Sequence, residues 1–187
     1  MRAATWDTKF GDDMPVYAAA ISEAGIRPGG TAIDVGCGTG RALPPLRDAI
    51  GPGGRVIGVD LTPEMLASAQ SKVRADDRCA LVLADARALP FAAATADAVF
   101  AAGLVNHLPD PAAGLAELAR VTRAGGLLIL FHPVARATLA ARHGRTISPD
   151  EILSAGPLHA AARAAGWEVT TYDDAADRFL AIARRRA

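Results

Sequence analysis

Short apolar runs alternate along the chain with longer segments whose apolar residues recur at helical spacing. Runs of this length are typical of buried strands, and strands that alternate with helices are typical of a parallel sheet covered by helices. The predicted strands are Ala32–Val35, Val56–Val59, Ala80–Ala84, Ala98–Ala102, Leu127–Phe131, Trp167–Tyr172 and Phe179–Ala183. The pattern therefore predicts an α/β fold.

Capping residues, prolines and glycines mark the helix boundaries. A capping side chain directly before a proline is typical of a helix start. Such pairs are Thr62-Pro63, Asp110-Pro111 and Ser148-Pro149. Glycines favour helix ends, and we expect ends at Gly25, Gly125-Gly126 and Gly166. Pro44 and Pro45 fit a helix after Gly40 only if it begins late and holds both prolines in its first turn.

The last two predicted strands are separated only by the residues from Asp173 to Arg178. A crossover between parallel neighbours needs about a dozen residues or more. These two strands must therefore form a hairpin, which makes the last strand antiparallel in a mostly parallel sheet.

Length and composition fit a single globular domain. The chain has 187 residues, of which 51% are hydrophobic and 21% charged, and no internal repeat or low-complexity linker divides it. Basic and acidic residues number 20 each. The balance gives no reason to expect nucleic acid or a membrane surface as the partner.

No feature of an exported or membrane-bound protein is apparent in the sequence. The segment from Met1 to Asp13 lacks the apolar core of a signal peptide, and the stretch Leu127–Phe131 is too short to span a bilayer. Cys37 and Cys79 are too few for a disulfide scaffold. We expect a soluble, cytoplasmic protein and predict no metal ligands.

Three glycines follow the first predicted strand at every second position: Gly36, Gly38 and Gly40. Without a Cβ atom they let the backbone turn sharply and approach a ligand closely. The helix that follows offers unpaired N–H groups to an anionic group such as a carboxylate or phosphate. A simple turn is the alternative interpretation of such a loop taken alone.

Two acidic residues make the prediction more specific. Asp60 ends the second strand, where a carboxylate can accept hydrogen bonds from both hydroxyls of a ribose. Asp85 ends the third strand, where it can accept from an adenine amino group. Either acid alone is more often a helix cap or a solvated strand end. Together with the glycines, at one edge of a parallel sheet, they indicate a cofactor site.

A nicotinamide cofactor is the natural competitor. Its fingerprint has glycines spaced G-x-G-x-x-G/A, with the third site packed against the helix. Counted from Gly36 and Gly38, the third site is Arg41, which does not allow such packing. The spacing therefore disfavours a nicotinamide oxidoreductase.

Three segments resemble successive motifs of class I methyltransferases, and the type 11 group is the most similar. These segments are Asp34–Gly40, Gly58–Leu66 and Asp85–Phe91. Asn106–Pro111 and Gly125–Ile129 continue the similarity in the same order. It extends from about Thr31 to Phe131, and the terminal hairpin also resembles the end of that family.

The resemblance implies a Rossmann-like, doubly wound sheet of seven strands in the order 3-2-1-4-5-7-6, with helices on both faces. It also implies S-adenosylmethionine as the cofactor and S-adenosylhomocysteine as the product. The resemblance further implies that residues 1–187 form one methyltransferase domain. Residues 1–25 are then a helical cover, 31–132 the cofactor-binding core, and 133–187 a short lid and the hairpin.

The resemblance also implies a role for each cofactor-site residue. Asp34 and the three glycines lie by the methionine part, and Asp60 lies at the ribose. Leu61 and Met65 lie beside the purine, and Asp85 and Ala86 lie at the adenine edge. Ala102 lies close to the sulfonium end.

Methyl transfer from a sulfonium is an in-line displacement, so the main task of the enzyme is to hold acceptor and methyl group in line. A base is required only when the acceptor arrives protonated. His107 and His132, which follow the fourth and fifth strands, are the candidates. A structural histidine is the alternative for each, and a reaction without a dedicated base is equally open. Asn106 either holds an acceptor or caps the turn before Pro109.

Two segments are expected to cover the acceptor. In Met1–Ala20 we expect the aromatic residues Trp6, Phe10 and Tyr17 to pack on the sheet rather than shield a ligand. In His132–Ser154 we expect a solvated basic face, with an acidic acceptor as the alternative. Its residues, with the acids that could pair with them, are Arg136, Arg142, His143, Arg145, Asp7, Asp12 and Asp13.

The leading hypothesis is a small-molecule O-, N- or C-methyltransferase, because the connection between the fifth and sixth strands has no room for a large lid. A second subunit, in a homodimer, is the other way to complete the pocket. A nucleic-acid methyltransferase lacks support, because there is no Asn-Pro-Pro-Tyr-like run and no basic excess. A non-catalytic cofactor-binding regulator stays open, because no base is unambiguous.

Overall fold

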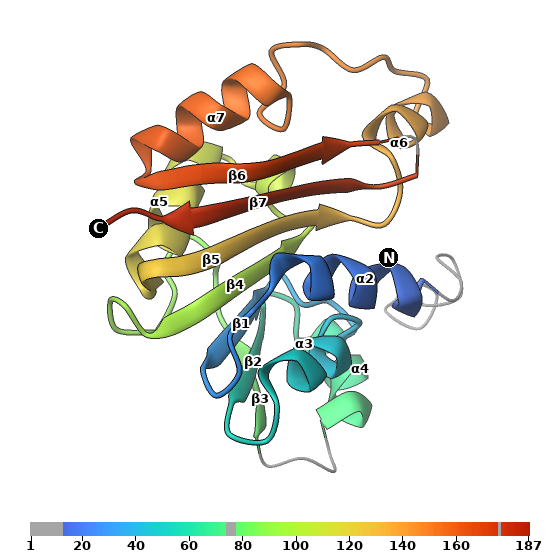
Figure 1. The fold of residues 1–187 in the computed structure, drawn as a ribbon. Coiled ribbons are helices and arrows are strands. Elements are labelled where there is room, and N and C mark those ends of the chain that lie inside the picture. Colours follow the sequence, from blue (N-terminus) through green and yellow to red (C-terminus); the bar gives the residue numbers. More distant parts are fainter. Residues whose placement is uncertain (1–12, 74–77, 176) are drawn as a thin grey trace.

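The computed structural model describes residues 13–73, 78–175 and 177–187. Its strands are β1 (Thr31–Val35), β2 (Arg55–Asp60), β3 (Cys79–Leu83), β4 (Ala96–Ala102), β5 (Thr122–His132), β6 (Trp167–Asp174) and β7 (Phe179–Arg185). They form one sheet in the order β3-β2-β1-β4-β5-β7-β6 (Figure 1). All predicted strands are confirmed, as are the order and the antiparallel pairing of β7 with both β5 and β6.

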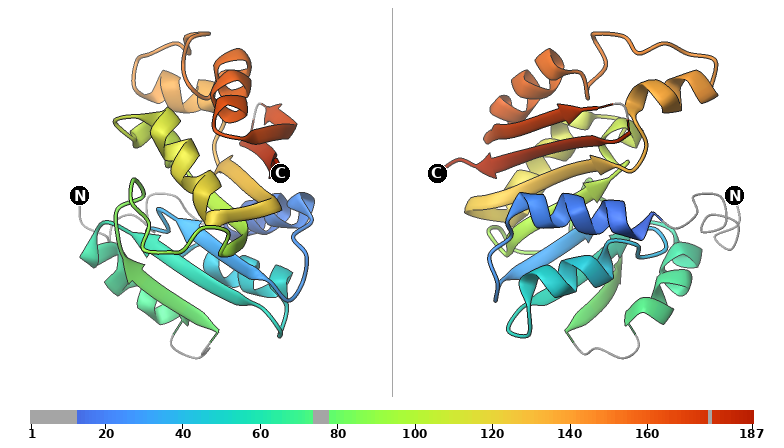
Figure 2. Two further views of the ribbon diagram at one scale, coloured as in Figure 1. Left: turned by 90° about the vertical axis from the view of Figure 1, so that its left-hand side faces the viewer. Right: turned by 45° about the vertical axis from the view of Figure 1, so that its right-hand side comes forward.

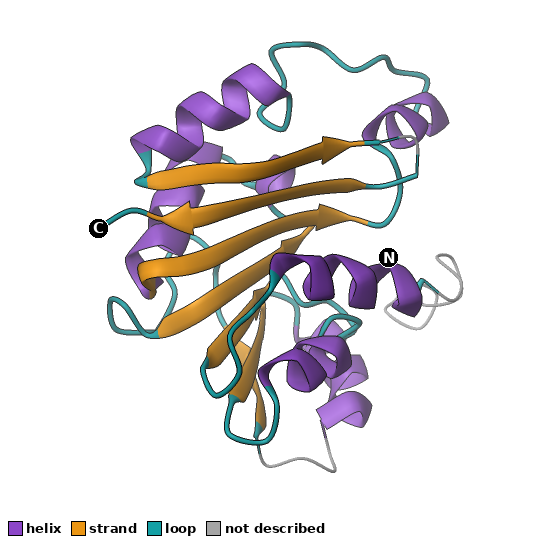
Figure 3. Ribbon diagram, in the orientation of Figure 1, coloured by secondary structure: helices purple, strands orange, loops and turns teal. Residues whose placement is uncertain are grey.

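Helices cover both faces of this sheet (Figures 2 and 3). They are α2 (Met14–Ala24), α3 (Leu43–Ile50), α4 (Pro63–Val73), α5 (Pro111–Val121), α6 (Arg136–Arg142) and α7 (Ala155–Ala164), with a 3₁₀ turn, η1 (Val105–His107). Among these helices, none is long and apolar enough to cross a membrane.

The core consists of two apolar layers, one on each face of the sheet. Side chains alternate between the faces along each strand. In β4, Val99 packs in the layer of α5 and α7, whereas Ala98 and Phe100 pack in the layer of α2, α3 and α4. Tyr17 of α2 lies on this second layer, with its ring centroid 4.9 Å from that of Phe131. Its predicted packing on the sheet is confirmed, while Trp6 and Phe10 lie outside the described residues.

Most of the predicted helix boundaries are confirmed. The Asp110 side chain accepts a hydrogen bond from the Ala113 N–H at 3.0 Å, at the start of α5. The helix α4 begins at Pro63, and α3 begins at Leu43, so that Pro44 and Pro45 lie in its first turn. Gly25 and Gly166 follow α2 and α7 with the positive φ that favours glycine at a helix end.

The prediction that a helix starts at Ser148-Pro149 is wrong. The chain makes turns there, and α7 begins only at Ala155. The Ser148 hydroxyl accepts the Asp150 N–H at 3.2 Å, as expected of a cap, but the Arg136 guanidinium donates to the Leu153 carbonyl at 3.0 Å. A bond from another part of the chain thus occupies a carbonyl that a continuing helix would use.

The helix end predicted at Gly125-Gly126 is also wrong, because α5 ends at Val121 and β5 begins at Thr122. The Thr122 hydroxyl donates to the Leu118 carbonyl at 2.7 Å and so satisfies one of the last acceptors of the helix. Both glycines instead lie within the first part of β5.

Candidate functional site

The loop after β1 is bound to the end of β2 by backbone hydrogen bonds. The N–H groups of Gly36 and Cys37 both donate to the Val59 carbonyl, at 2.8 and 2.9 Å. The Gly38 N–H donates to Asp60 Oδ2 at 2.8 Å, and the Thr62 N–H donates to Asp60 Oδ1 at 2.9 Å. The structure therefore brings together the glycine loop and Asp60, as the sequence predicted. Each carboxylate oxygen keeps acceptor capacity beyond its single backbone bond.

Asp34 is a buried acid with an unpaired carboxyl oxygen. The residue is 1% exposed, and its Oδ2 has no partner among the described residues. Burial, and secondarily the nearby charge of Asp60, raises the pKa of Asp34 to about 8. A buried carboxyl group with an unpaired oxygen favours a cationic partner. The site therefore fits a ligand that carries an ammonium group, such as the amino group of S-adenosylmethionine.

The three glycines of the loop have different surroundings, although φ is positive at each of them. A Cβ atom added to Gly40 would lie 2.9 Å from Leu43 Cδ1 and 3.0 Å from Ala69 Cβ, and one added to Gly36 would lie 3.2 Å from Leu104 Cδ1. A Cβ added to Gly38 would meet no described atom within 4 Å. Gly36 and Gly40 thus serve packing, while Gly38 faces open space where a ligand can approach the backbone.

The residues predicted at the adenosine lie along the ends of β2 and β3. Leu61 is 64% exposed, which is unusual for a large apolar side chain, and Met65 is half-buried on α4. Asp85 forms a bidentate ion pair with Arg87, which holds the pKa of that carboxyl at about 2. Its acceptor capacity is therefore shared with Arg87. Ala86 packs partly against the layer of α5.

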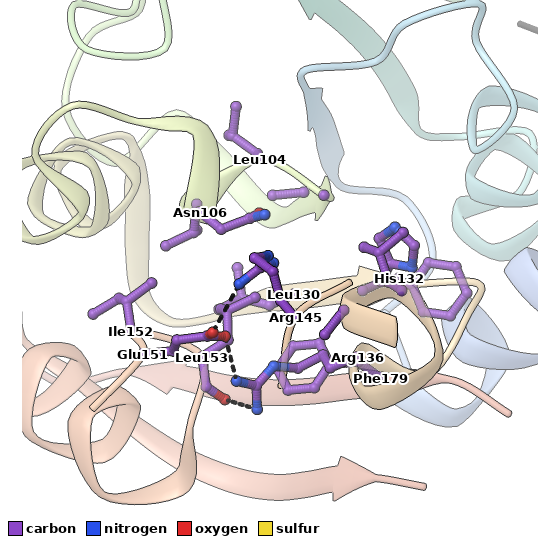
Figure 4. Close-up of a pocket in the computed structure, with 16 residues that line it drawn as sticks. Leu104, Asn106, Leu130, His132, Arg136, Arg145, Glu151, Ile152, Leu153 and Phe179 are labelled. Carbon is purple, nitrogen blue, oxygen red and sulfur yellow. Dashed lines mark hydrogen bonds and ion pairs between the residues drawn. The ribbon is translucent and has the colours of Figure 1, made fainter. Parts of the chain in front are cut away.

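A pocket of about 290 Å³ opens at the ends of β4 and β5 (Figure 4). Its walls are mostly apolar, and its polar residues are Asn106, His132, Arg136, Arg145 and Glu151. Leu104 lines the pocket and also touches the glycine loop at Gly36, so the two sites adjoin. Ala102 packs against the layer of α2 and α3, whereas its neighbours Ala101 and Gly103 line the pocket.

The two candidate histidines lie in different surroundings. His132 lines the pocket and is half-buried, and its Nδ1 lies 2.8 Å from the carbonyl oxygen and 3.1 Å from the backbone nitrogen of Val134. Burial, followed by the charges of His107 and Arg142, lowers the pKa of His132. His107 is exposed on η1 and does not line the pocket, whereas its neighbour Asn106 does.

The basic segment after β5 differs from the prediction at one position. Arg142, His143 and Arg145 are exposed, as expected of a solvated face, but Arg136 is buried. Asp13 pairs with Arg41 of the glycine loop. Asp7 and Asp12 lie outside the described residues.

Several residues that line the pocket were not predicted from the sequence, among them Leu104, Glu151 and Phe179. Glu151 belongs to the mispredicted helix, and Phe179 begins a strand far along the chain. Their contribution depends on tertiary packing, which hydrophobic periodicity does not show.

Comparison with known proteins points in the same direction as the geometry. The model of the family described as "Methyltransferase domain" matches residues 33–130. A demethylmenaquinone methyltransferase from Staphylococcus aureus is 35% identical over 109 residues, 58% of this chain and 45% of that protein. An uncharacterised 37.1 kDa protein in transposon TN4556 of Streptomyces fradiae is 38% identical over 107 residues, 57% of this chain and 31% of that protein. The chain thus matches less than half the length of these curated relatives.

Solved structures share the fold over nearly the whole chain. A SAM-dependent methyltransferase from Aquifex aeolicus is 25% identical, with a TM-score of 0.73, and covers 92% of this chain and 89% of its own. A chain from the complex between the Haloferax volcanii Trm112 methyltransferase activator and its methyltransferase partner is 23% identical. Its TM-score is 0.81, and it covers 99% of this chain and 96% of its own. At that identity the second comparison supports the fold alone.

Proposed function

Because the chain belongs to the class I S-adenosylmethionine-dependent methyltransferase family, we propose that it transfers a methyl group to a small-molecule acceptor bound in the pocket beside Leu104. One observation carries this proposal. The glycine loop, with the buried acid Asp34 and the bond from Gly38 to Asp60, adjoins a pocket large enough for a small molecule. A site for a methyl donor and a site for an acceptor thus lie side by side.

We assign the cofactor to residues of the 31–132 segment. Asp34 would accept from the amino group of the methionine part, and Gly38 would give the backbone room to approach it. Asp60 would accept from the ribose hydroxyls, and the exposed Leu61 would cover the purine. The remaining proposed contacts are Met65, Asp85, Ala86 and Ala102, while Gly36 and Gly40 shape the loop through their packing.

When bound, S-adenosylmethionine supplies a methyl group on a positively charged sulfur, which a nucleophile attacks in line. The chain then has to orient the acceptor and exclude water. The apolar walls formed by Leu104, Leu130 and Phe179 suit that role. Orientation of this kind supplies roughly 7–11 kcal/mol of the barrier in well-aligned reactions.

For an acceptor that arrives protonated, we place the base at His132. Its lowered pKa keeps the ring neutral near pH 7 and therefore able to accept a proton. If Nδ1 carries the ring proton and donates to the Val134 carbonyl, Nε2 remains as the acceptor. His107 is less suited because it lies outside the pocket.

A thermal-shift series with S-adenosylmethionine, S-adenosylhomocysteine, NADH and NADPH tests the cofactor assignment. A ligand at about 100 times its Kd stabilises the folded state by roughly 2.7 kcal/mol. The first two compounds should raise the melting temperature and the two nicotinamides should not. The opposite result would contradict the proposal.

Turnover separates the enzyme from a non-catalytic cofactor-binding protein. Release of S-adenosylhomocysteine in the presence of small-molecule acceptors supports the proposal, whereas transfer confined to nucleic acid would contradict the acceptor class. The assay should be repeated across protein concentrations, because a homodimer or a separate activator would appear as a dependence of specific activity on concentration or on added partner.

A further inference from the structure

The charged side chains around the pocket form a closed network centred on Arg136. The Arg136 Nη1 donates to Leu153 O at 3.0 Å and to Asp174 Oδ2 at 2.8 Å. The Arg136 Nη2 donates to Glu151 Oε2 at 3.2 Å and to the Ser154 hydroxyl at 3.1 Å. Each terminal nitrogen of this guanidinium is therefore already engaged within the protein. Arg136 has little capacity left to bind an anionic ligand.

Glu151 also neutralises the second arginine that lines the pocket. Its Oε1 accepts from Arg145 Nη1 at 3.2 Å, so one carboxylate lies between two guanidinium groups (Figure 4). Asp174 also pairs with Arg136, so two carboxylates neutralise the two arginines that line the pocket. Arg142 is exposed and does not line the pocket, so it offers an anion there no direct ion pair.

The rest of the lining is apolar and offers few hydrogen bonds. Leu104, Leu130, Ile152 and Phe179 line the pocket, and Asn106 and His132 are its polar residues outside the ion-pair network. Burial and the neighbouring positive charges lower the pKa of His132, so this ring adds no cation near neutral pH. A volume of about 290 Å³ lies just below the range of roughly 300–1,000 Å³ that is typical of small-molecule pockets, which favours a compact ligand.

We infer that this pocket selects a compact, uncharged and largely apolar acceptor, and that Glu151 is the residue that excludes anionic ones. That the selected molecule is a methyl acceptor rests on the proposed function, whereas the binding preference follows from the pocket alone. An anion would have to take Arg136 or Arg145 from its carboxylate partner and so break one of the two ion pairs of Glu151. A neutral molecule leaves the network intact and gains from the apolar walls.

Two naphthalene probes of similar shape, 2-naphthol and 2-naphthoate, test this preference at pH 7. Binding is measured by calorimetry on the full chain, both with and without saturating S-adenosylhomocysteine. The wild-type protein should bind 2-naphthol at least tenfold more tightly than 2-naphthoate. The variant Ile152→Trp, which fills the pocket, should lose the binding of 2-naphthol.

The variant Glu151→Gln removes the charge while nearly keeping the shape. It should bind 2-naphthoate at least tenfold more tightly than the wild type does, with little change for 2-naphthol. Glu168→Gln, at an exposed position on β6, is the matched control and should change neither affinity. Asp174→Asn, which frees the other side of Arg136, should act in the same direction as Glu151→Gln and serves if that variant does not fold.

Equal or tighter binding of 2-naphthoate by the wild type would overturn the inference, as would binding of neither probe or binding that survives Ile152→Trp. An unchanged affinity of folded Glu151→Gln and Asp174→Asn for 2-naphthoate would remove the role of Glu151. A protein that prefers 2-naphthol but does not bind S-adenosylhomocysteine would retain the pocket preference and lose the proposed function, so the two failures are distinguishable.

Discussion

The environment of Asp34 is the clearest indication of a ligand site, because this acid is buried and its Oδ2 has no partner among the described residues. Its pKa of about 8 in the folded state lies far above the value near 3.9 of an unfolded chain. Protonated Asp34 therefore favours the folded state. Its contribution to stability is complete below about pH 4 and is lost as the pH rises to about 8, where the folded carboxyl group finally ionises.

Replacement of Asp34 by Asn removes this titration. The unfolding free energy of Asp34→Asn, relative to wild type, should therefore increase by about 1.4 kcal/mol per pH unit from pH 5 to pH 7 and level off above pH 8. Urea denaturation of the ligand-free proteins at four pH values measures it. Asp48→Asn, whose side chain is largely exposed, is the control and should show no such trend. Parallel pH profiles for Asp34→Asn and wild type would show that Asp34 is not an unpaired buried acid.

Alanine substitutions at Gly38 and Gly40 distinguish a glycine that a ligand approaches from a glycine that serves packing. Gly38→Ala should cost about 1–2 kcal/mol for the positive φ and yet weaken S-adenosylmethionine binding at least tenfold, because its Cβ enters the open space. Gly40→Ala should be more destabilising, because its Cβ also crowds Leu43 and Ala69. Thermal melts and calorimetry on both variants measure the two effects. A Gly38→Ala variant with normal affinity would place the ligand elsewhere.

His132 is the residue through which pH should act on turnover. With an acceptor that needs deprotonation, His132→Gln should lower kcat by about 10²–10⁴ with little change in cofactor affinity, while His107→Gln should have no effect. Since its pKa lies below the usual 6.5, activity should hold from pH 8 to 7 and fall only below about 6.5. Undiminished turnover of His132→Gln would leave the reaction without a histidine base.

At the scale of elements, the sheet could be predicted from the sequence because its strands are short, apolar and bounded by clear stops. The hairpin of β6 and β7 followed from the length of its connection alone. The glycine loop and Asp60 were placed together because parallel strands end at one edge. Each of these features depends on short sequence patterns, so the sequence alone is enough to predict them.

The elements around the pocket could not be predicted in the same way. Ser148-Pro149 carries a valid helix-start signal, yet the Arg136 guanidinium binds the turns that follow and the helix is delayed to Ala155. The sequence context assigns Arg136 to a solvated face, but in the structure Arg136 is buried and pairs with Glu151 and Asp174. Both errors come from one long-range interaction, which periodicity does not encode.

Arg136 should therefore hold α6, the turns at 148–154 and β6 together. Its replacement by Met removes the charged hydrogen bonds to Glu151 and Asp174. Because both carboxylates are partly exposed and Glu151 keeps Arg145, we expect a cost of about 1–3 kcal/mol. The melting temperature of Arg136→Met should fall accordingly. Arg142→Met lies on the same helix with an exposed side chain and should be nearly neutral. Similar melting temperatures for the two variants would show that the network does not stabilise this region.

At the scale of the whole molecule, one edge of the sheet carries two adjoining sites. The glycine loop and Asp60 lie on the side of β1 and β2, and the pocket lies at the ends of β4 and β5. Leu104 touches both, since it lines the pocket and lies against Gly36. This arrangement suits a transfer reaction, because a donor and an acceptor bound in the two sites would lie side by side at one edge of the sheet.

The most direct test is calorimetric titration of the ligand-free protein with S-adenosylmethionine at pH 7, in buffers of different ionisation enthalpy. Because burial raises the pKa of Asp34 to about 8, its carboxyl group should lose a proton when it pairs with the amino group of the ligand, so binding should release up to one proton per molecule. The same titration of Asp34→Asn should show little binding and no proton release. Tight binding of S-adenosylmethionine without proton release, or the absence of binding, would contradict the assignment of this site.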